Sequence, residues 1–129
     1  MTYETLLEMA YEATKRAYVP YSKFKVGAAL LTEDGKVFTG CNIECASYGG
    51  TNCAERTAVF KAVSEGYTKF KAIAVVSASD SIAYPCGICR QVLNEFAPDI
   101  DIILDDNGTM QVINLKEMLP YSFGPSDLR

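Results

Sequence analysis

Three consecutive pieces of the chain decide the fold: KAIAVVS at residues 71–77, PCGICRQVLNEF at residues 85–96 and DIIL at residues 101–104. The first piece is a continuous apolar run, which is typical of a buried central strand. The second is predicted to be a helix that begins after Pro85 and ends before Pro98. The third is predicted to be a short strand. A strand, a helix and a strand in this order indicate an α/β layer with at least one parallel pair of strands.

Turn and cap signals place the other elements around this unit. Thr2 is a capping residue for an amphipathic helix that Pro20 ends. Asp34-Gly35 and Asn107-Gly108 are typical of tight hairpin turns, and Gly66 is a plausible helix stop. The expected helices cover residues 2–18, 53–65, 86–96 and a short piece within 114–119, and the expected strands cover residues 24–31, 36–43, 71–77, 101–104 and 110–113.

Length, composition and charge exclude several classes of protein. The chain has 129 residues, of which 49% are hydrophobic, and its formal net charge is −4. These values favour a single domain with one core over residues 1–129 and argue against disorder. The acid surplus argues against a nucleic-acid partner, and no apolar run approaches the length of a membrane span. Residues 1–9 carry acids but no Lys or Arg, so we expect no signal peptide there.

The counts of histidine and cysteine limit the possible chemistry. The chain has no His, which excludes His-based triads, His general bases and His metal ligands. It has five Cys. An odd number without a secretion signal favours free thiols in a reducing cytoplasm over a disulfide framework. Metal binding or acid–base catalysis must therefore use Cys, Asp, Glu, Lys or Tyr.

Three of the cysteines fall at the starts of two predicted helices. Cys86 and Cys89 form a C-x-x-C, which alone fits either a redox pair or part of a metal site. Cys53 begins the other helix, and the β-α-β-α order allows both N-termini to converge at one end of the sheet. The helix dipole there favours the thiolate, which is the form that binds metal. Three thiolates with an open fourth position are the pattern of a catalytic zinc site, whereas a structural site has four protein ligands.

Charged neighbours of these cysteines suggest further roles. Glu55 follows Cys53 in the same helical turn, where its carboxylate can relay protons beside the metal without binding it. Cys-x-Glu followed by Pro-Cys-x-x-Cys is a known signature of zinc deaminases, here with Cys in place of His as the first ligand. Arg56 and Arg90 can each donate to a thiolate and so draw charge off the metal. Arg56 is the better candidate, and the alternative is that both are ordinary surface arginines.

Over nearly its whole length the chain resembles the small, homotetrameric, zinc-dependent cytidine deaminases of the three-Cys type. The residues that carry this resemblance are Pro20-Tyr21-Ser22-Lys23-Phe24, Val26-Gly27-Ala28-Ala29, Gly40-Cys41-Asn42-Ile43-Glu44, Cys53-Ala54-Glu55-Arg56-Thr57-Ala58, Pro85-Cys86-Gly87-Ile88-Cys89-Arg90-Gln91, Leu119-Pro120 and Phe123-Gly124-Pro125. The resemblance implies a three-layer α/β/α sandwich with a mixed five-stranded sheet, one zinc ion per chain and a homotetramer with shared active sites. It also implies a cytoplasmic enzyme of pyrimidine salvage, with no nucleic-acid polymer or membrane as partner.

The resemblance assigns roles to individual residues. Cys53, Cys86 and Cys89 would hold zinc, Glu55 would be the catalytic proton shuttle, and Arg56 would tune the thiolates. Substrate contacts would come from six residues: Phe24 in the pocket, Asn42 and Glu44 at the ribose, the Ala54 N–H and the carbonyl near Tyr84 at the pyrimidine edge, and Phe123 stacking in a neighbouring subunit's site. The implied reaction is attack of zinc-activated water at C4 of cytidine or 2′-deoxycytidine, with release of ammonia and uridine or deoxyuridine.

Some positions depart from the family, and other functions remain open. Cys45 stands where Asn is frequent, Tyr84 where Ser is common before Pro-Cys, and Ile88 where Ala is frequent. Without the resemblance, the two phenylalanines would be assigned to a core or interface, and Asn42 and Glu44 to ordinary strand ends. The alternatives are a deaminase of a cytosine-containing antibiotic, which lacks the ribose contacts, and a non-catalytic zinc or redox module.

Overall fold

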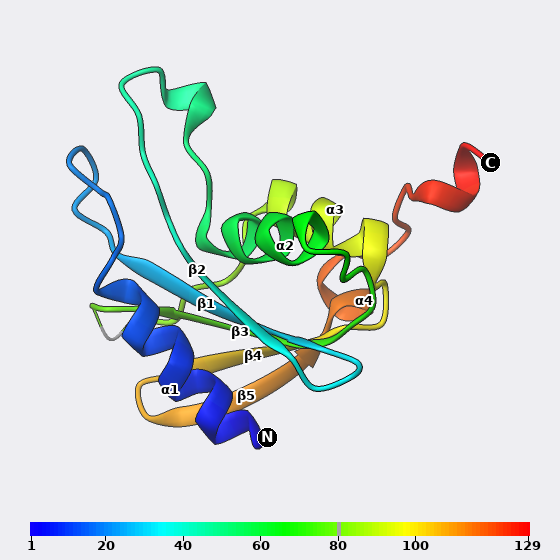
Figure 1. Cartoon of the computed structure of the whole chain (residues 1–129), viewed down its shortest axis with the longest axis horizontal. Helices are drawn as coiled ribbons and strands as arrows, with labels where there is room; N and C mark the ends of the chain where they lie inside the picture. Colours follow the sequence, from blue (N-terminus) through cyan, green and yellow to red (C-terminus); the bar gives the residue numbers. More distant parts are fainter. Residues whose placement is uncertain (80) are drawn as a thin grey trace.

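The computed structural model of the chain describes residues 1–79 and 81–129. Its centre is a five-stranded sheet with the strand order β2-β1-β3-β4-β5 (Figure 1). Within this sheet β3 and β4 run parallel, whereas the pairs β1–β2, β1–β3 and β4–β5 are antiparallel, so the expected mixed sheet is confirmed. The strands are β1 (Val26–Thr32), β2 (Val37–Cys41), β3 (Phe70–Ser77), β4 (Asp101–Asp106) and β5 (Thr109–Asn114).

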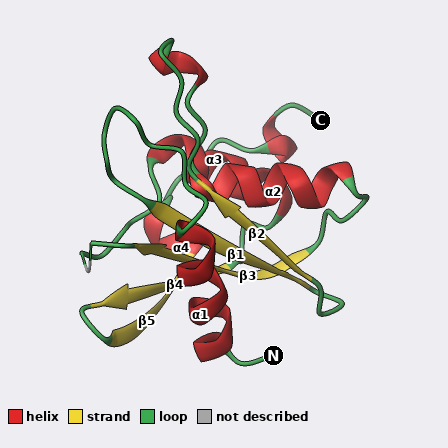
Figure 2. Ribbon diagram, turned by 60° about the vertical axis from the view of Figure 1, so that its left-hand side comes forward, coloured by secondary structure: helices red, strands yellow, loops and turns green. Residues whose placement is uncertain are grey.

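Helices cover both faces of the sheet and give the expected three layers (Figure 2). On one face lies α1 (Tyr3–Thr14), whose Leu6, Leu7 and Ala10 pack against alternate residues of β1, β3 and β4. The other face carries α2 (Ala54–Ser64), α3 (Gly87–Phe96) and α4 (Leu115–Met118) over a second apolar core. Two short 3₁₀ turns, η1 (Tyr48–Gly50) and η2 (Pro125–Asp127), complete the structure. No helix of the described residues is long and apolar enough to cross a membrane.

The first helix is shorter than the sequence suggests. Thr2 caps it as expected, because its side chain accepts a hydrogen bond from the Thr5 N–H at 3.1 Å. The helix ends at Thr14 rather than near Tyr18. The Tyr18 backbone instead pairs with the chain after β2, donating to Asn42 O at 3.0 Å and accepting from the Glu44 N–H at 2.9 Å. This pairing competes with the last helical turn, and local helical periodicity does not reveal it.

The turn predictions are confirmed. Gly35 lies in the β1–β2 turn with φ of +94°, and Gly66 follows α2 with φ of +93°. Asn107 and Gly108 both have positive φ between β4 and β5, as the Asn-Gly pattern of a tight hairpin requires.

Two glycines let helices approach the sheet very closely. A Cβ on Gly40 of β2 would lie 2.5 Å from Ala54 O and 2.6 Å from Ala58 N, both in α2. A Cβ on Gly27 of β1 would lie 2.1 Å from Ala10 O in α1. Because these neighbours are backbone atoms, they cannot move aside as a side chain tip could. Gly40 therefore sets the height of α2, including its N-terminal turn, above the sheet.

Candidate active site

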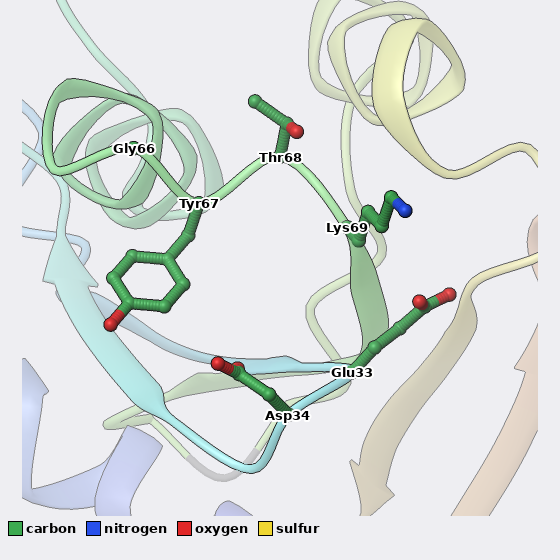
Figure 3. A pocket seen from close by; sticks show the side chains of 6 residues that line it. All are labelled: Glu33, Asp34, Gly66, Tyr67, Thr68 and Lys69. Carbon is green, nitrogen blue, oxygen red and sulfur yellow. The ribbon is translucent and has the colours of Figure 1, made fainter.

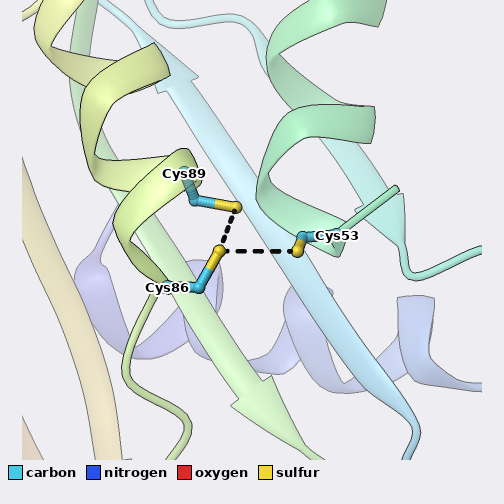
Figure 4. A group of neighbouring side chains, drawn as sticks. All are labelled: Cys53, Cys86 and Cys89. Carbon is cyan, nitrogen blue, oxygen red and sulfur yellow. Dashed lines mark hydrogen bonds between the residues drawn. The ribbon is translucent and has the colours of Figure 1, made fainter. Parts of the chain in front are cut away.

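Three cysteine sulfurs meet where α2 and α3 begin (Figure 4). Cys53 is the N-cap of α2, Cys86 is the N-cap of α3, and Cys89 lies in the first turn of α3. The Sγ atoms of Cys53 and Cys86 are 3.7 Å apart, and those of Cys86 and Cys89 are 3.6 Å apart. A tetrahedral zinc site with Zn–S bonds of about 2.3 Å has an S–S edge of about 3.8 Å. The three sulfurs therefore fit one zinc ion and leave one position of the tetrahedron free of protein ligands.

Hydrogen bonds within the cluster favour a thiolate at Cys53. The Cys89 thiol and the Arg56 guanidinium both donate to the Cys53 sulfur, and together they lower the pKa of Cys53 to about 5. The distance from Arg56 Nη2 to Cys53 Sγ is 3.2 Å. The same hydrogen bond to Cys53, together with burial, raises the pKa of Cys89. Arg56 thus lies where a residue must lie to draw negative charge from a metal-bound sulfur.

Glu55 places a carboxyl group beside the sulfur cluster. Its side chain is only 4% exposed, and this burial raises its pKa to about 7. A carboxyl group with a pKa near neutrality can both accept and return a proton at physiological pH. Glu55 and two of the three cysteines, Cys53 and Cys86, line the same cleft.

That cleft brings together most of the residues expected to bind substrate. Its volume is about 450 Å³, within the usual range for small-molecule sites. Phe24, Asn42, Ala54 and Tyr84 all line it. It is also lined by five residues to which the sequence analysis gives no role in the site: Val26, Thr51, Val75, Ile82 and Ala83. Four of these are small or medium apolar residues, whose sequence pattern is the same as that of core residues.

Glu44 lies in a second hollow that adjoins the cleft. This hollow has a volume of about 400 Å³ and is lined by Tyr21, Ser22, Glu44, Tyr48 and Thr51. Thr51 lines both hollows, so the two are neighbours. The Glu44 carboxylate accepts from the backbone N–H groups of Tyr21 and Ser22, both at 3.1 Å, and from the Ser22 hydroxyl.

Phe123 lies outside the cleft of its own chain. Its side chain is 59% exposed, but its backbone is held firmly against α3. The side-chain amides of Gln91 and Asn94 donate to Phe123 O at 2.7 and 3.2 Å. A Cβ on Gly124 would lie 2.9 Å from Asn94 Nδ2, so glycine permits this close approach. The result is an aromatic ring presented to the surroundings on a fixed backbone.

Arg90 does not share the role of Arg56. Its Nε donates to Pro85 O at 2.7 Å and its Nη1 donates to Met118 O at 2.9 Å. The hypothesis that Arg90 bonds a thiolate is therefore wrong, because its donors serve two backbone carbonyls. Through these two hydrogen bonds, Arg90 connects the segment before Cys86 to the end of α4.

The remaining cysteines lie apart from the cluster. Cys45 Sγ donates to Ser47 O at 2.7 Å and joins no group of metal-ligating residues among those described. Cys41, at the end of β2, is half-buried.

A separate hollow of about 500 Å³ lies at the far end of α2, near Gly66, between the β1–β2 turn and the start of β3 (Figure 3). Its labelled side chains spread apart rather than converge on one point. It therefore lacks the arrangement of a catalytic site.

The fold and the site together define a class of protein, the zinc-dependent hydrolytic deaminases. Residues 1–103 match the family model of the cytidine and deoxycytidylate deaminase zinc-binding region. Curated relatives named cytidine deaminase include one from Sporosarcina psychrophila, 48% identical over 99% of this chain and 96% of its own. Another, from Halalkalibacterium halodurans, is 51% identical over 99% and 98%.

Solved structures agree with these relatives. A crystal structure of cytidine deaminase from Burkholderia pseudomallei is 50% identical to this chain. It aligns with a TM-score of 0.90 over 95% of this chain and 100% of its own. The chain therefore belongs to the cytidine deaminase family.

Proposed function

We propose that this protein hydrolyses cytidine and 2′-deoxycytidine to uridine and deoxyuridine, with release of ammonia, as a step of pyrimidine salvage. The observation that carries the proposal is a buried carboxyl group, Glu55, beside three converging cysteine sulfurs in one cleft. This combination suits the transfer of protons between water and an amine. The relatives named cytidine deaminase support the choice of substrate.

Five residues around the sulfur cluster have distinct roles in the proposed reaction. Cys53, Cys86 and Cys89 would hold the zinc ion, which would supply Lewis-acid activation of water. Glu55 would carry one proton to N3 of the pyrimidine, where it stays in the uracil product, and a second proton from the hydroxyl group added at C4 to the leaving amine, which departs as ammonia. Arg56 draws charge from the Cys53 thiolate and thereby preserves the acidity of the metal.

Substrate orientation uses backbone and side-chain groups around the two hollows. The Ala54 N–H and the carbonyl near Tyr84 read the pyrimidine edge, and Phe24 lines the base pocket. Asn42 and Glu44 bind the ribose on its 3′ side, so the 2′-hydroxyl is not required. The adjoining positions of the cleft and the second hollow support this division between base and sugar.

The charge of the two hollows favours a free nucleoside over a nucleotide. The family model covers both cytidine and deoxycytidylate deaminases. Among the described residues, neither hollow is lined by Lys or Arg, whereas Glu44 and Glu55 each contribute a carboxyl group. A phosphate group would thus meet negative charge without a cation lining the site to bind it.

We also propose that residues 1–129 form one catalytic domain that assembles into a cytoplasmic homotetramer with shared active sites. The exposed Phe123 ring on its fixed backbone supports a contribution to a neighbouring subunit. The five cysteines are all free, which supports a reducing compartment.

Zinc content and substrate range test this function. We expect about one zinc per chain and ammonia release from cytidine and deoxycytidine, with at most trace release from deoxycytidine 5′-monophosphate. Absence of ammonia release from both nucleosides by the zinc-loaded protein would overturn the proposal. Equal rates with the monophosphate would instead contradict the preference for free nucleosides.

A further inference from the structure

Ser22 connects two of the residues proposed to bind substrate, although it was assigned no role. It lies in the turn between α1 and β1 and lines the hollow that contains Glu44. Its hydroxyl donates to Glu44 Oε2, and the same oxygen accepts from the Phe24 N–H at 3.0 Å. A serine hydroxyl can fill both roles at once, since it is both a donor and an acceptor. One oxygen atom therefore ties the carboxylate of Glu44 to the backbone of Phe24.

The surrounding turn is shaped to make this connection. Lys23 has φ of +62°, in the left-handed region that side-chain-bearing residues seldom adopt. Its N–H donates to Val19 O at 3.1 Å, which closes the turn. Within this turn, the backbone N–H groups of Tyr21 and Ser22 both donate to the same oxygen, Glu44 Oε1.

The hydrogen bonds at Glu44 are distributed unequally over its two carboxylate oxygens. Oε1 already accepts two hydrogen bonds, whereas Oε2 accepts one, from the Ser22 hydroxyl. A carboxylate oxygen can accept two, so Oε2 has one acceptor position that no group of the described residues fills. The Ser22 hydroxyl thus fixes the rotation of the carboxylate and the direction in which this free position points. The same hydroxyl lowers the pKa of Glu44, which keeps the acceptor charged.

Asn42 fastens the other side of the same segment. Its Oδ1 accepts from the Val26 N–H at 3.0 Å, and its Nδ2 donates to Phe24 O at 2.7 Å. Phe24 is therefore held at its N–H by Ser22 and at its carbonyl by Asn42. The sugar side of the site is thus one connected network. Of the three side chains that make these hydrogen bonds, Ser22, Asn42 and Glu44, Ser22 is the one not itself proposed to touch the substrate.

We infer that Ser22 is a positioning residue for the sugar, which orients the Glu44 carboxylate toward the 3′-hydroxyl of the nucleoside. The inference rests on the proposed function, because it assumes that Glu44 binds the ribose. A preoriented acceptor favours substrate binding, since less freedom is lost when the complex forms. The chemistry at C4 does not involve this contact, so Ser22 acts on KM and not on kcat.

Steady-state kinetics of Ser22→Ala with two substrates test the inference. With cytidine, we expect KM to rise about fivefold to twentyfold, with kcat within about twofold of the unsubstituted protein. With 2′,3′-dideoxycytidine, which lacks the 3′-hydroxyl, the same substitution should raise KM less than about twofold. Replacing Ser22 and removing the 3′-hydroxyl from the substrate both weaken the same hydrogen bond to Glu44. Their effects on KM are therefore not additive. Ser22→Thr keeps a hydroxyl and should restore most of the affinity.

Ser64→Ala is the matched control, because its hydroxyl donates to Lys61 O near the end of α2, away from both hollows. It should leave both KM values unchanged. An unchanged KM for cytidine in Ser22→Ala would overturn the inference, as would equal KM increases for the two substrates. The failure of the proposed function is distinguishable, because the unsubstituted protein would then release no ammonia from cytidine.

Discussion

The two ends of the substrate site are built in different ways. The sulfur end consists of the first turns of α2 and α3, with Glu55 and Cys89 buried in the fold. The sugar end consists of the turn before β1 and the projecting segment between β2 and α2 (Figure 1). Regular elements thus fix the cysteine sulfurs and Glu55, whereas loops joined by side-chain hydrogen bonds fix the residues that we propose to contact the sugar. This difference predicts that changes at the sulfur end affect metal binding and turnover, and that changes at the sugar end affect KM.

The largest expected effect at the sulfur end follows from removing one ligand. Cys53→Ser should reduce zinc content well below one per chain and reduce ammonia release by about 10³-fold or more, because a hydroxyl is a poor substitute for a thiolate ligand. Metal analysis and steady-state kinetics measure both. Cys45→Ser is the control, since the Cys45 sulfur donates to Ser47 O and lies apart from the cluster, so this variant should keep its zinc. A Cys53→Ser protein with full zinc and turnover would favour a site that uses only Cys86 and Cys89.

The next largest effect concerns the packing that holds α2 in place. Gly40→Ala would force a Cβ against the backbone of α2. Gly27→Ala would force a Cβ against the backbone of α1, which lies on the opposite face of the sheet. We expect each to destabilise the fold by about 1–3 kcal/mol. Only Gly40→Ala should also weaken zinc binding, because α2 carries Cys53. Thermal melts and zinc titrations with a chelator distinguish the two, and equal zinc affinities would show that the height of α2 does not control the site.

A smaller effect is expected from the arginine that contacts the cluster. Arg56→Gln removes the charged donor to Cys53, so we expect kcat to fall about tenfold while zinc remains bound. Arg90→Gln is the comparison, because Arg90 bonds the carbonyls of Pro85 and Met118 and not a thiolate. It should lower the melting temperature without a comparable fall in kcat. If both variants lose kcat equally, Arg56 has no special influence on the thiolates.

The sequence predicts the sulfur end well because its signals are local. Cys53 and Cys86 each stand at a helix N-cap, and Cys89 follows one turn after Cys86, so spacing alone brings the sulfurs to two helix starts. The apolar run and the Asp34-Gly35 and Asn107-Gly108 turns likewise indicate the sheet and its hairpins.

The sugar end is less accessible to such reasoning because its contacts are long-range. The bond from Ser22 to Glu44 joins residues 22 positions apart, and neither residue type is unusual in a loop. A long-range contact also explains why α1 ends earlier than the sequence predicts, since the Tyr18 backbone pairs with the chain after β2. The role of Arg90 also depends on Met118, which is 28 residues away.

In the proposed reaction, the buried carboxyl group of Glu55 beside the three-sulfur cluster carries the proton transfers. Glu55→Gln tests it most directly, because the amide keeps the shape of the side chain but cannot relay a proton. We expect the variant to bind one zinc per chain and to keep its melting temperature within a few degrees, while ammonia release from cytidine falls about 10³-fold or more. A variant that retains zinc and turns cytidine over at the unsubstituted rate would contradict the claim.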